Sequence, residues 1–87
     1  MLVLSLLLEA NVEVAMQWMK MGAAFAAAAA VFAAAFGISK IGRSALESIA
    51  RQPEAANDLR SSMIVASALI EGATFFAIVV CLLVLFV

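Results

Sequence analysis

The chain contains a run of 25 residues, Met63–Val87, in which Glu71 is the only charged side chain. A helix of about 20 apolar residues crosses the hydrocarbon core of a membrane, so this run is long enough to span one. A second apolar run, from about Val14 to Gly37, is interrupted only by Gln17 and Lys20. The two runs predict two membrane-spanning helices separated by a polar segment.

The composition supports a membrane protein, because 68% of only 87 residues are hydrophobic. A soluble domain this small buries about 60% of its chain surface, which leaves a heavily oligomeric soluble protein as the alternative. With no His and a lone Cys81, a zinc-type metal site is not expected. The sequence also lacks a Gly-rich phosphate loop with Lys, so we expect no nucleotide cofactor and no enzymatic activity in the chain itself.

The cations indicate how the chain is oriented. Lys40, Arg43, Arg51 and Arg60 lie in the segment between the apolar runs, whereas Lys20 is the only other cation. Positive residues favour the cytoplasmic side, so we expect a cytoplasmic connection and both termini outside.

The first eight residues are strongly apolar and are too short to span a membrane. A signal peptide is the alternative interpretation, but the segment lacks a positive start and an obvious polar cleavage region. We interpret it as an uncleaved, membrane-dipping extension of the first helix.

The polar segment places the turn between the helices. Pro53 disfavours helix at the residue before it, and Asn57 or Asp58 can cap a following helix. We therefore predict a single hairpin domain over residues 1–87, with helix one at about 11–50, a loop at about 51–57 and helix two at about 58–87. The short loop makes the two helices antiparallel.

Helix one combines one bulky stripe with two rows of small residues. At about 100° per residue, the bulky side chains fall on a stripe about 60° wide, which we expect to face helix two. The small rows lie on nearly opposite flanks and allow close helix neighbours on both sides, which closes into a ring if the rotation permits. Alternatively, the alanines are there simply as good helix formers. The stripe is Val14, Trp18, Met21, Phe25, Phe32 and Phe36, and the rows are Ala27, Val31, Ala35 and Ser39, and Ala29, Ala33 and Gly37.

Glu71 lies about 12 Å into its span, near the middle of the membrane. A carboxylate there costs from about 3 to more than 10 kcal/mol and is by default a functional-site hypothesis. Without a counter-charge the neutral form is favoured, so the group can carry a proton between environments that favour different states. Ser67 and Thr74 are possible supporting hydroxyls. A Glu that only hydrogen-bonds across an oligomer interface is the alternative.

The segment 45–55, ALESIARQPEA, followed by Glu71 18 residues after Pro53, resembles the c subunit of F-type ATP synthases. The resemblance covers about residues 14–87. It implies a closed ring of identical hairpins in the bacterial inner membrane, with helix one on the inside of the ring and membrane lipids around the ring. Glu71 would carry the ion between two half-channels of the neighbouring a subunit, where an Arg favours the ionised form. Arg51, Gln52 and Pro53 would contact the central stalk, and no nucleic acid would be bound.

The chain departs from that family in helix one. Alanines, with Val31 among them, occupy the register of the family's alternating glycines. The added methyl groups would space the inner helices more widely, which predicts a ring larger than typical. The alanine-rich segment also resembles the N-type branch of these ATPases, for which Na⁺ pumping has been suggested.

The choice of ion follows from the ligands available. By resemblance, the sodium-coupled relatives place oxygen ligands at positions that correspond here to Ile38, Gly72, Ala73 and Phe76. None of these side chains can coordinate a cation, and a dehydrated hard cation needs several oxygens. We therefore predict H⁺, with a Na⁺-coupled ring as the alternative. Outside this family, a small proton-coupled two-span transporter and a holin-like pore former are the competing functions.

Overall fold

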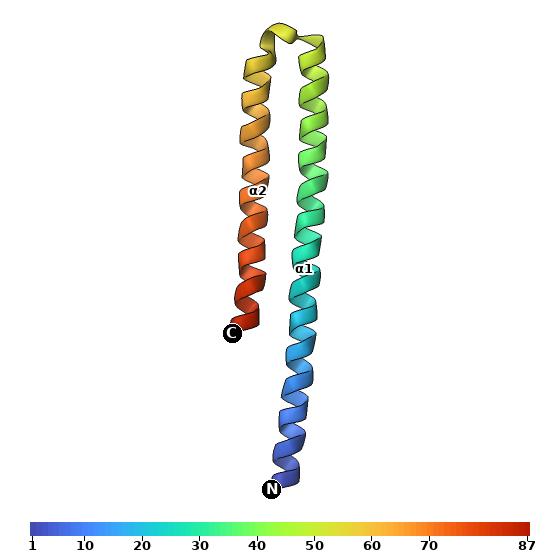
Figure 1. Ribbon diagram of the computed structural model, residues 1–87, viewed down its shortest axis with the longest axis vertical. Coiled ribbons are helices and arrows are strands. Elements are labelled where there is room, and N and C mark those ends of the chain that lie inside the picture. Colours follow the sequence, from blue (N-terminus) through green and yellow to red (C-terminus); the bar gives the residue numbers. More distant parts are fainter.

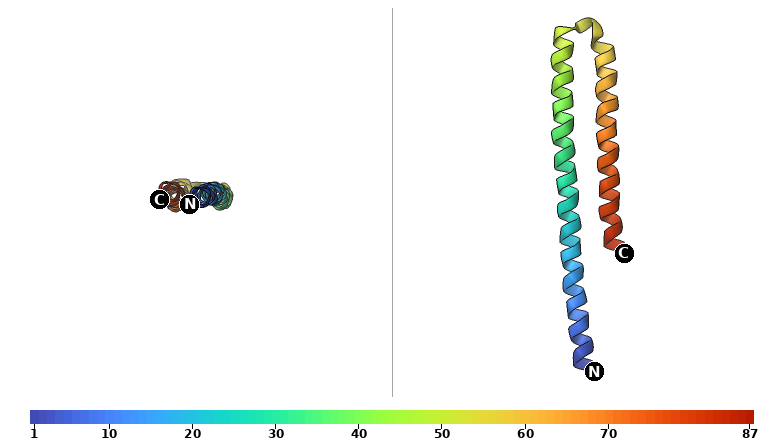
Figure 2. Two further views of the ribbon diagram at one scale, coloured as in Figure 1. Left: turned by 90° about the horizontal axis from the view of Figure 1, so that it is seen from below. Right: turned by 180° about the vertical axis from the view of Figure 1, so that it is seen from behind.

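The computed structural model describes residues 1–87 and consists of two long helices joined by a tight turn (Figure 1). Helix α1 spans Leu2–Arg51, the 3₁₀ turn η1 spans Pro53–Ala55, and helix α2 spans Ala56–Phe86. The helices run side by side and antiparallel in an elongated hairpin of 77 × 16 × 7 Å (Figure 2). Both are long and apolar enough to cross a membrane. The predicted all-α transmembrane hairpin is confirmed.

Helix α1 begins at Leu2, not near residue 11 as expected from the sequence. The first ten residues contain no Pro or Gly, so nothing in them interrupts a helix. In the first turn, the Ser5 hydroxyl donates a hydrogen bond of 3.1 Å to the Met1 carbonyl. The apolar N-terminal segment is therefore a continuous part of α1.

The turn is shorter than the predicted loop of residues 51–57. Gln52 leaves the helical conformation, and its N–H donates to the Ser48 carbonyl over 2.9 Å. Pro53 then opens η1, since its fixed φ suits the first position of a helical turn. Gln52 in turn accepts a hydrogen bond of 2.9 Å from the Ala55 N–H.

Helix α2 starts at Ala56 rather than at about residue 58, and the expectation that Asn57 or Asp58 caps it was wrong. Ala55 occupies the cap position and makes no side-chain cap hydrogen bond. The continuing η1 turn supplies backbone partners instead, because Ala56 donates its N–H to the Pro53 carbonyl. Asp58 lies in the first turn of α2, where its charge favours the helix dipole.

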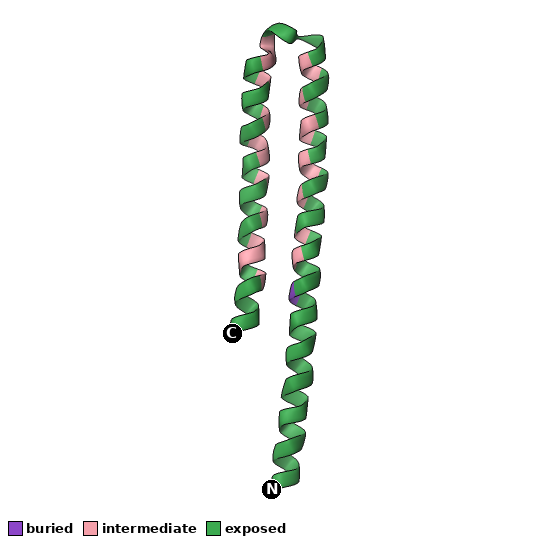
Figure 3. Cartoon of the chain, in the orientation of Figure 1, coloured by how far each residue is buried: buried purple, intermediate pink, exposed green.

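The bulky stripe of α1 does not face α2, contrary to the prediction from sequence. Phe25, Phe32 and Phe36 are 71%, 74% and 58% exposed, and the rest of the stripe is equally open. The residues of α1 that α2 covers lie on the opposite side of the helix and are mostly small (Figure 3). They are Ala23, Ala27, Ala30, Ala34, Gly37, Ile38, Ile41, Gly42, Ala45, Ser48 and Ile49.

The reason lies in the partner helix, which supplies the bulky side chains of this interface. On α2 the half-buried positions include Leu59, Met63, Ile70 and Ile78. Large residues on one helix need small ones opposite if the helices are to approach closely. The phenylalanines of α1 are therefore directed away from α2.

The hairpin leaves almost all of its apolar surface open, with Ala23 as its single buried residue, at 9% exposure. The small rows contribute Ala27 and Gly37 to the contact with α2, whereas Ala29, Ala33 and Ala35 stay exposed on the flanks of α1. Exposed apolar area on this scale marks a surface made for lipid and other protein chains.

Candidate ion-binding site at Glu71

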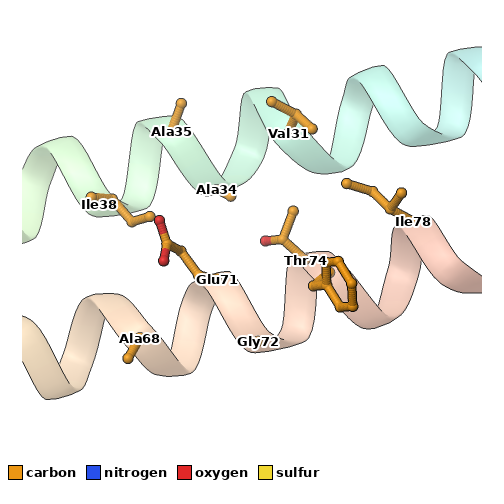
Figure 4. Close-up of a pocket in the computed structure, with 10 residues that line it drawn as sticks. Val31, Ala34, Ala35, Ile38, Ala68, Glu71, Gly72, Thr74 and Ile78 are labelled. Carbon is orange, nitrogen blue, oxygen red and sulfur yellow. The ribbon is translucent and has the colours of Figure 1, made fainter.

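An open groove of about 670 Å³ lies between the two helices at the height of Glu71 (Figure 4). Seven of its ten lining residues are hydrophobic. They are Val31, Ala34, Ala35 and Ile38 from α1, and Ala68, Glu71, Gly72, Thr74, Phe75 and Ile78 from α2. The small residues on both helices create the space in which the carboxyl lies.

Glu71 occupies the midpoint of α2, and its carboxyl lies between the helices beside the Ile38 side chain (Figure 4). It forms no hydrogen bond or ion pair within the chain. The side chain is exposed along the open side of the groove. A carboxyl in this position can exchange a proton with a group outside the hairpin without breaking an internal contact.

Of the two predicted supporting hydroxyls, only Thr74 lines the groove with Glu71. Its hydroxyl donates a hydrogen bond of 2.8 Å to the Ile70 carbonyl, four residues earlier on the same helix. This back-bonding is usual for Thr in helices and uses the hydroxyl proton. Ser67 is half-buried but does not line the groove.

The four positions considered for sodium ligands separate into two pairs. Ile38 and Gly72 line the groove around Glu71, whereas Ala73 and Phe76 do not. Phe76 is 71% exposed and belongs to the outer surface of α2. None of the four contributes a side-chain oxygen. The groove therefore offers one carboxylate and one hydroxyl that already serves the backbone.

Arg51, Gln52 and Pro53 lie together at the turn, and all three are exposed. They are separated from Glu71 by about half the length of α2, roughly 22 Å at 1.5 Å per residue. The chain's only ion pair is also near this end, between Arg43 Nε and Glu47 Oε1 at 3.3 Å. The cationic half of the hairpin thus does not reach the groove.

Along α1, Lys40 lies between the groove and the turn. Its Nζ is 4.8 Å from the centre of the Phe36 ring, a cation–π contact. Phe36 belongs to the bulky stripe, and Lys40 does not line the groove around Glu71.

Sequence reasoning missed Ala34 and Ile78 as members of the site. Both were detectable from helical spacing alone. Ala34 is one turn from Ile38, and Ile78 is two turns from Glu71, which places each on the same helix face as a residue already under consideration.

Together, the fold and the site define a membrane-spanning hairpin with a lone carboxyl at mid-span beside a small-residue groove. The family model for the ATP synthase c subunit matches residues 21–84. A protein of Bacteroides thetaiotaomicron, named as the c subunit of ATP synthase, is 55% identical over 85 residues, 98% of this chain and 99% of the relative. The chain belongs to the family of ATP synthase c subunits.

Two further relatives carry the same name. The protein from Phocaeicola vulgatus is 61% identical over 67 residues, which are 77% of this chain and 80% of the relative. The protein from Latilactobacillus sakei is 46% identical over 66 residues, which are 76% of this chain but 94% of the relative.

Proposed function

We propose that Glu71 carries protons across the membrane by reversible protonation while a ring of these subunits rotates. As a family member, the chain is a rotor-ring subunit in the membrane sector of an F-type ATP synthase and is not itself an enzyme. The observation that carries the proposal is the position of Glu71, a lone carboxyl at the midpoint of α2 that opens on a groove without any internal partner.

The proposed cycle depends on the surroundings of the carboxyl. In contact with lipid a charge on Glu71 is costly, because the chain gives the carboxylate no ion pair and no hydrogen bond. The ionised form needs compensation from a neighbouring chain, for which a cation of the a subunit is the natural source. Glu71 then takes up a proton from one half-channel and releases its proton to the other as the ring passes.

The groove favours H⁺ over Na⁺ as the transported ion. Coordination of a hard cation requires several oxygens around it. The groove supplies the Glu71 carboxylate, whereas Ile38 and Gly72 supply hydrocarbon and a bare backbone. Thr74 is the one nearby hydroxyl, and its proton already bonds to Ile70. A proton needs only the carboxylate itself.

The turn is the proposed contact with the central stalk. Arg51, Gln52 and Pro53 are exposed at the end of the hairpin that carries most of the cations. The positive-inside rule assigns this end to the cytoplasm and both termini to the outside of a bacterial inner membrane. Identical subunits, the a subunit and the central stalk are then the protein partners, and lipid covers the remaining apolar surface.

Carbodiimide labelling of the assembled complex tests the site and the ion together. Labelling should fall on Glu71 and disappear in Glu71→Gln, with the ring still intact. Glu71→Asp is the matched control, because it retains an acid that is shorter by one methylene, and it should retain partial labelling and partial proton transport. Protection of wild-type Glu71 by Na⁺ at neutral pH would contradict proton selectivity and support the sodium-coupled alternative.

Native mass of the detergent-solubilised assembly tests the ring independently of the ion. A closed ring has a mass of many subunits, whereas a proton-coupled two-span exchanger of the dimeric kind would have a mass of two. A dimer as the largest species would contradict the rotor function.

A further inference from the structure

Helix α1 extends well past the end of α2, so its N-terminal part has no partner in the hairpin (Figures 1 and 2). Near its C-terminal end, α2 meets α1 at a groove that Val84 shares with Met19 and Gly22. Residues 2–16, the N-terminal extension, lie beyond this point and span about 22 Å of helix. Every residue of the extension is exposed.

The extension lies outside the segment that the family model matches, residues 21–84, although the Bacteroides thetaiotaomicron relative aligns over 98% of this chain. The ion-carrying groove and the turn both lie within residues 21–84. Their function therefore does not account for the extension.

The extension is amphipathic, with one narrow polar strip. Ser5, Glu9 and Glu13 follow one another at i+4 steps, so they form a strip along one side of the helix. Most of the remaining circumference is apolar, and Leu4, Leu6, Leu7, Leu8, Val12 and Val14 are each 56% to 58% exposed. Asn11 is the one polar side chain away from the strip. A helix of this pattern needs an apolar partner over most of its surface.

The membrane itself is a poor partner for this segment. The hairpin fixes the direction of α1. The apolar run of α2, Met63–Val87, is 25 residues long, about 37 Å at 1.5 Å per residue, which already exceeds the hydrocarbon core of about 30 Å, so the end of α2 should lie at or beyond the outer edge of the bilayer. To lie flat on the membrane the extension would have to bend sharply, and sharp helix kinks occur at Pro, Gly or an inserted group. No Pro or Gly precedes Gly22, and α1 is continuous through this region. On this geometry the extension leaves the membrane along the axis of α1 and does not dip into it, unlike the membrane-dipping segment expected from the sequence.

We propose that the N-terminal extensions of neighbouring subunits pack against one another outside the membrane and form a collar that continues the ring of α1 helices. This rests on the proposed ring. In a ring, every subunit presents its extension at the same height and in parallel, and tethering of this kind gives effective concentrations on the order of millimolar. Each extension then covers the leucines of the next.

The two flanks of α1 support this partner, because the extension continues both of them. At about 100° per residue, Leu4 and Leu8 lie on the same flank as Ala29 and Ala33. These alanines are exposed and free to meet a neighbouring subunit within the membrane. The flank on the opposite side of α1 also continues into the extension.

On that opposite flank, Leu6 and Ala10 lie in line with Val31 and Ala35. A helix that meets one neighbour on each flank in the membrane will meet the same neighbours in the extension. The polar strip of Glu9 is then directed to the outside of the collar, toward water.

Cysteine cross-linking in the assembled complex tests the collar. In a Cys81→Ala background, Leu6→Cys and Leu8→Cys place one thiol on each flank, so oxidation should join each subunit to the next. A ladder of covalent multimers up to the full ring is expected. Each single substitution should give no ladder beyond a dimer, because it leaves one flank without a thiol. Ser5→Cys with Glu9→Cys is the matched control, since it places both thiols on the outward strip.

The possible outcomes separate the collar from the ring. An intact ring by native mass in which the leucine pair gives no ladder would overturn the collar and leave the proposed function in place. A ladder equally strong for the Ser5 and Glu9 pair would also overturn it. The intact mass of the mature subunit must include the extension, and its absence would again overturn the collar. If the wild-type chain forms no ring at all, the proposed function fails instead.

Discussion

Gly37 of α1 and Ile70 of α2 meet so closely that a Cβ atom at Gly37 would lie 3.3 Å from Ile70 Cδ1. Ile70 is one residue before Glu71 and also accepts the Thr74 hydroxyl through its carbonyl. The contact therefore sets how near the two helices come at the height of the ion-binding groove. It also explains why α1 turns its small residues toward α2.

Replacement of Gly37 tests this contact. Gly37→Ala should gain helix propensity, up to about 1 kcal/mol, but the new methyl group displaces Ile70, so the net gain should be smaller than that of Gly42→Ala. Gly42 is the matched control, because a Cβ there has no atom within 4 Å. Thermal dissociation of the assembly in detergent measures the difference.

A second substitution shows whether Ile70 is the cause. Ile70→Val removes the Cδ1 atom that the new methyl group would displace. The double variant Gly37→Ala with Ile70→Val should therefore be more stable than the sum of the two single effects predicts, by about 0.5 kcal/mol or more. If the stability effects of the two changes are simply additive, Ile70 is not what opposes a larger side chain at Gly37.

Ion selectivity can be tested by building the missing ligands. Ile38→Gln combined with Gly72→Ser adds two side-chain oxygens to residues that line the groove with Glu71. We expect this variant to bind Na⁺, seen as protection of Glu71 from carbodiimide by salt that has no effect on the wild type. Phe76→Tyr is the matched control, since Phe76 lies outside the groove and its new hydroxyl should give no protection by itself. Equal protection in the control would mean that the groove does not define the ion site.

Thr74 should contribute to helix geometry rather than to proton binding. Thr74→Val keeps the shape of the side chain and removes the hydroxyl that bonds to the Ile70 carbonyl at 2.8 Å. We expect the stability to change by about 1 kcal/mol or less, with the pH dependence of carbodiimide labelling unchanged. A shifted labelling profile in Thr74→Val, restored in Thr74→Ser, would instead assign the hydroxyl to the proton site.

The sequence predicted the hairpin well because its signals are strong and local. Two long apolar runs and Pro53 determine the helices and the turn, and the lone charge of Glu71 marks the site without any tertiary information. The face that α1 presents to α2 was predicted wrongly. The phenylalanine stripe is the most apolar face of α1. In a membrane, however, lipid is as apolar as Phe, so the closeness of approach decides which face packs.

The start of α1 was also missed, for a different reason. Sequence signals for a helix start are caps, and none occurs near Leu2, where Met1 makes no side-chain cap hydrogen bond. The predicted start at about residue 11 falls at Asn11, a residue type that often precedes a helix. Helix α1 nevertheless continues through Asn11, because no residue before it breaks the helix.

The size of the ring is the remaining consequence of the small-residue flanks. Ala29, Ala33 and Ala35 stay exposed beside the contact with α2, and Val31 is 50% exposed among them. Where a glycine would allow the closest approach, each of these side chains adds at least one methyl group between inner helices. Wider spacing of the inner helices relative to the outer ones lowers the curvature of the ring. More subunits are then needed to close it, and we expect a ring larger than is typical of the family.

Counting the subunits by native mass spectrometry measures the ring size directly. Val31→Gly and Ala35→Gly together should shift the count downward, and a wild-type ring smaller than typical would contradict the steric argument.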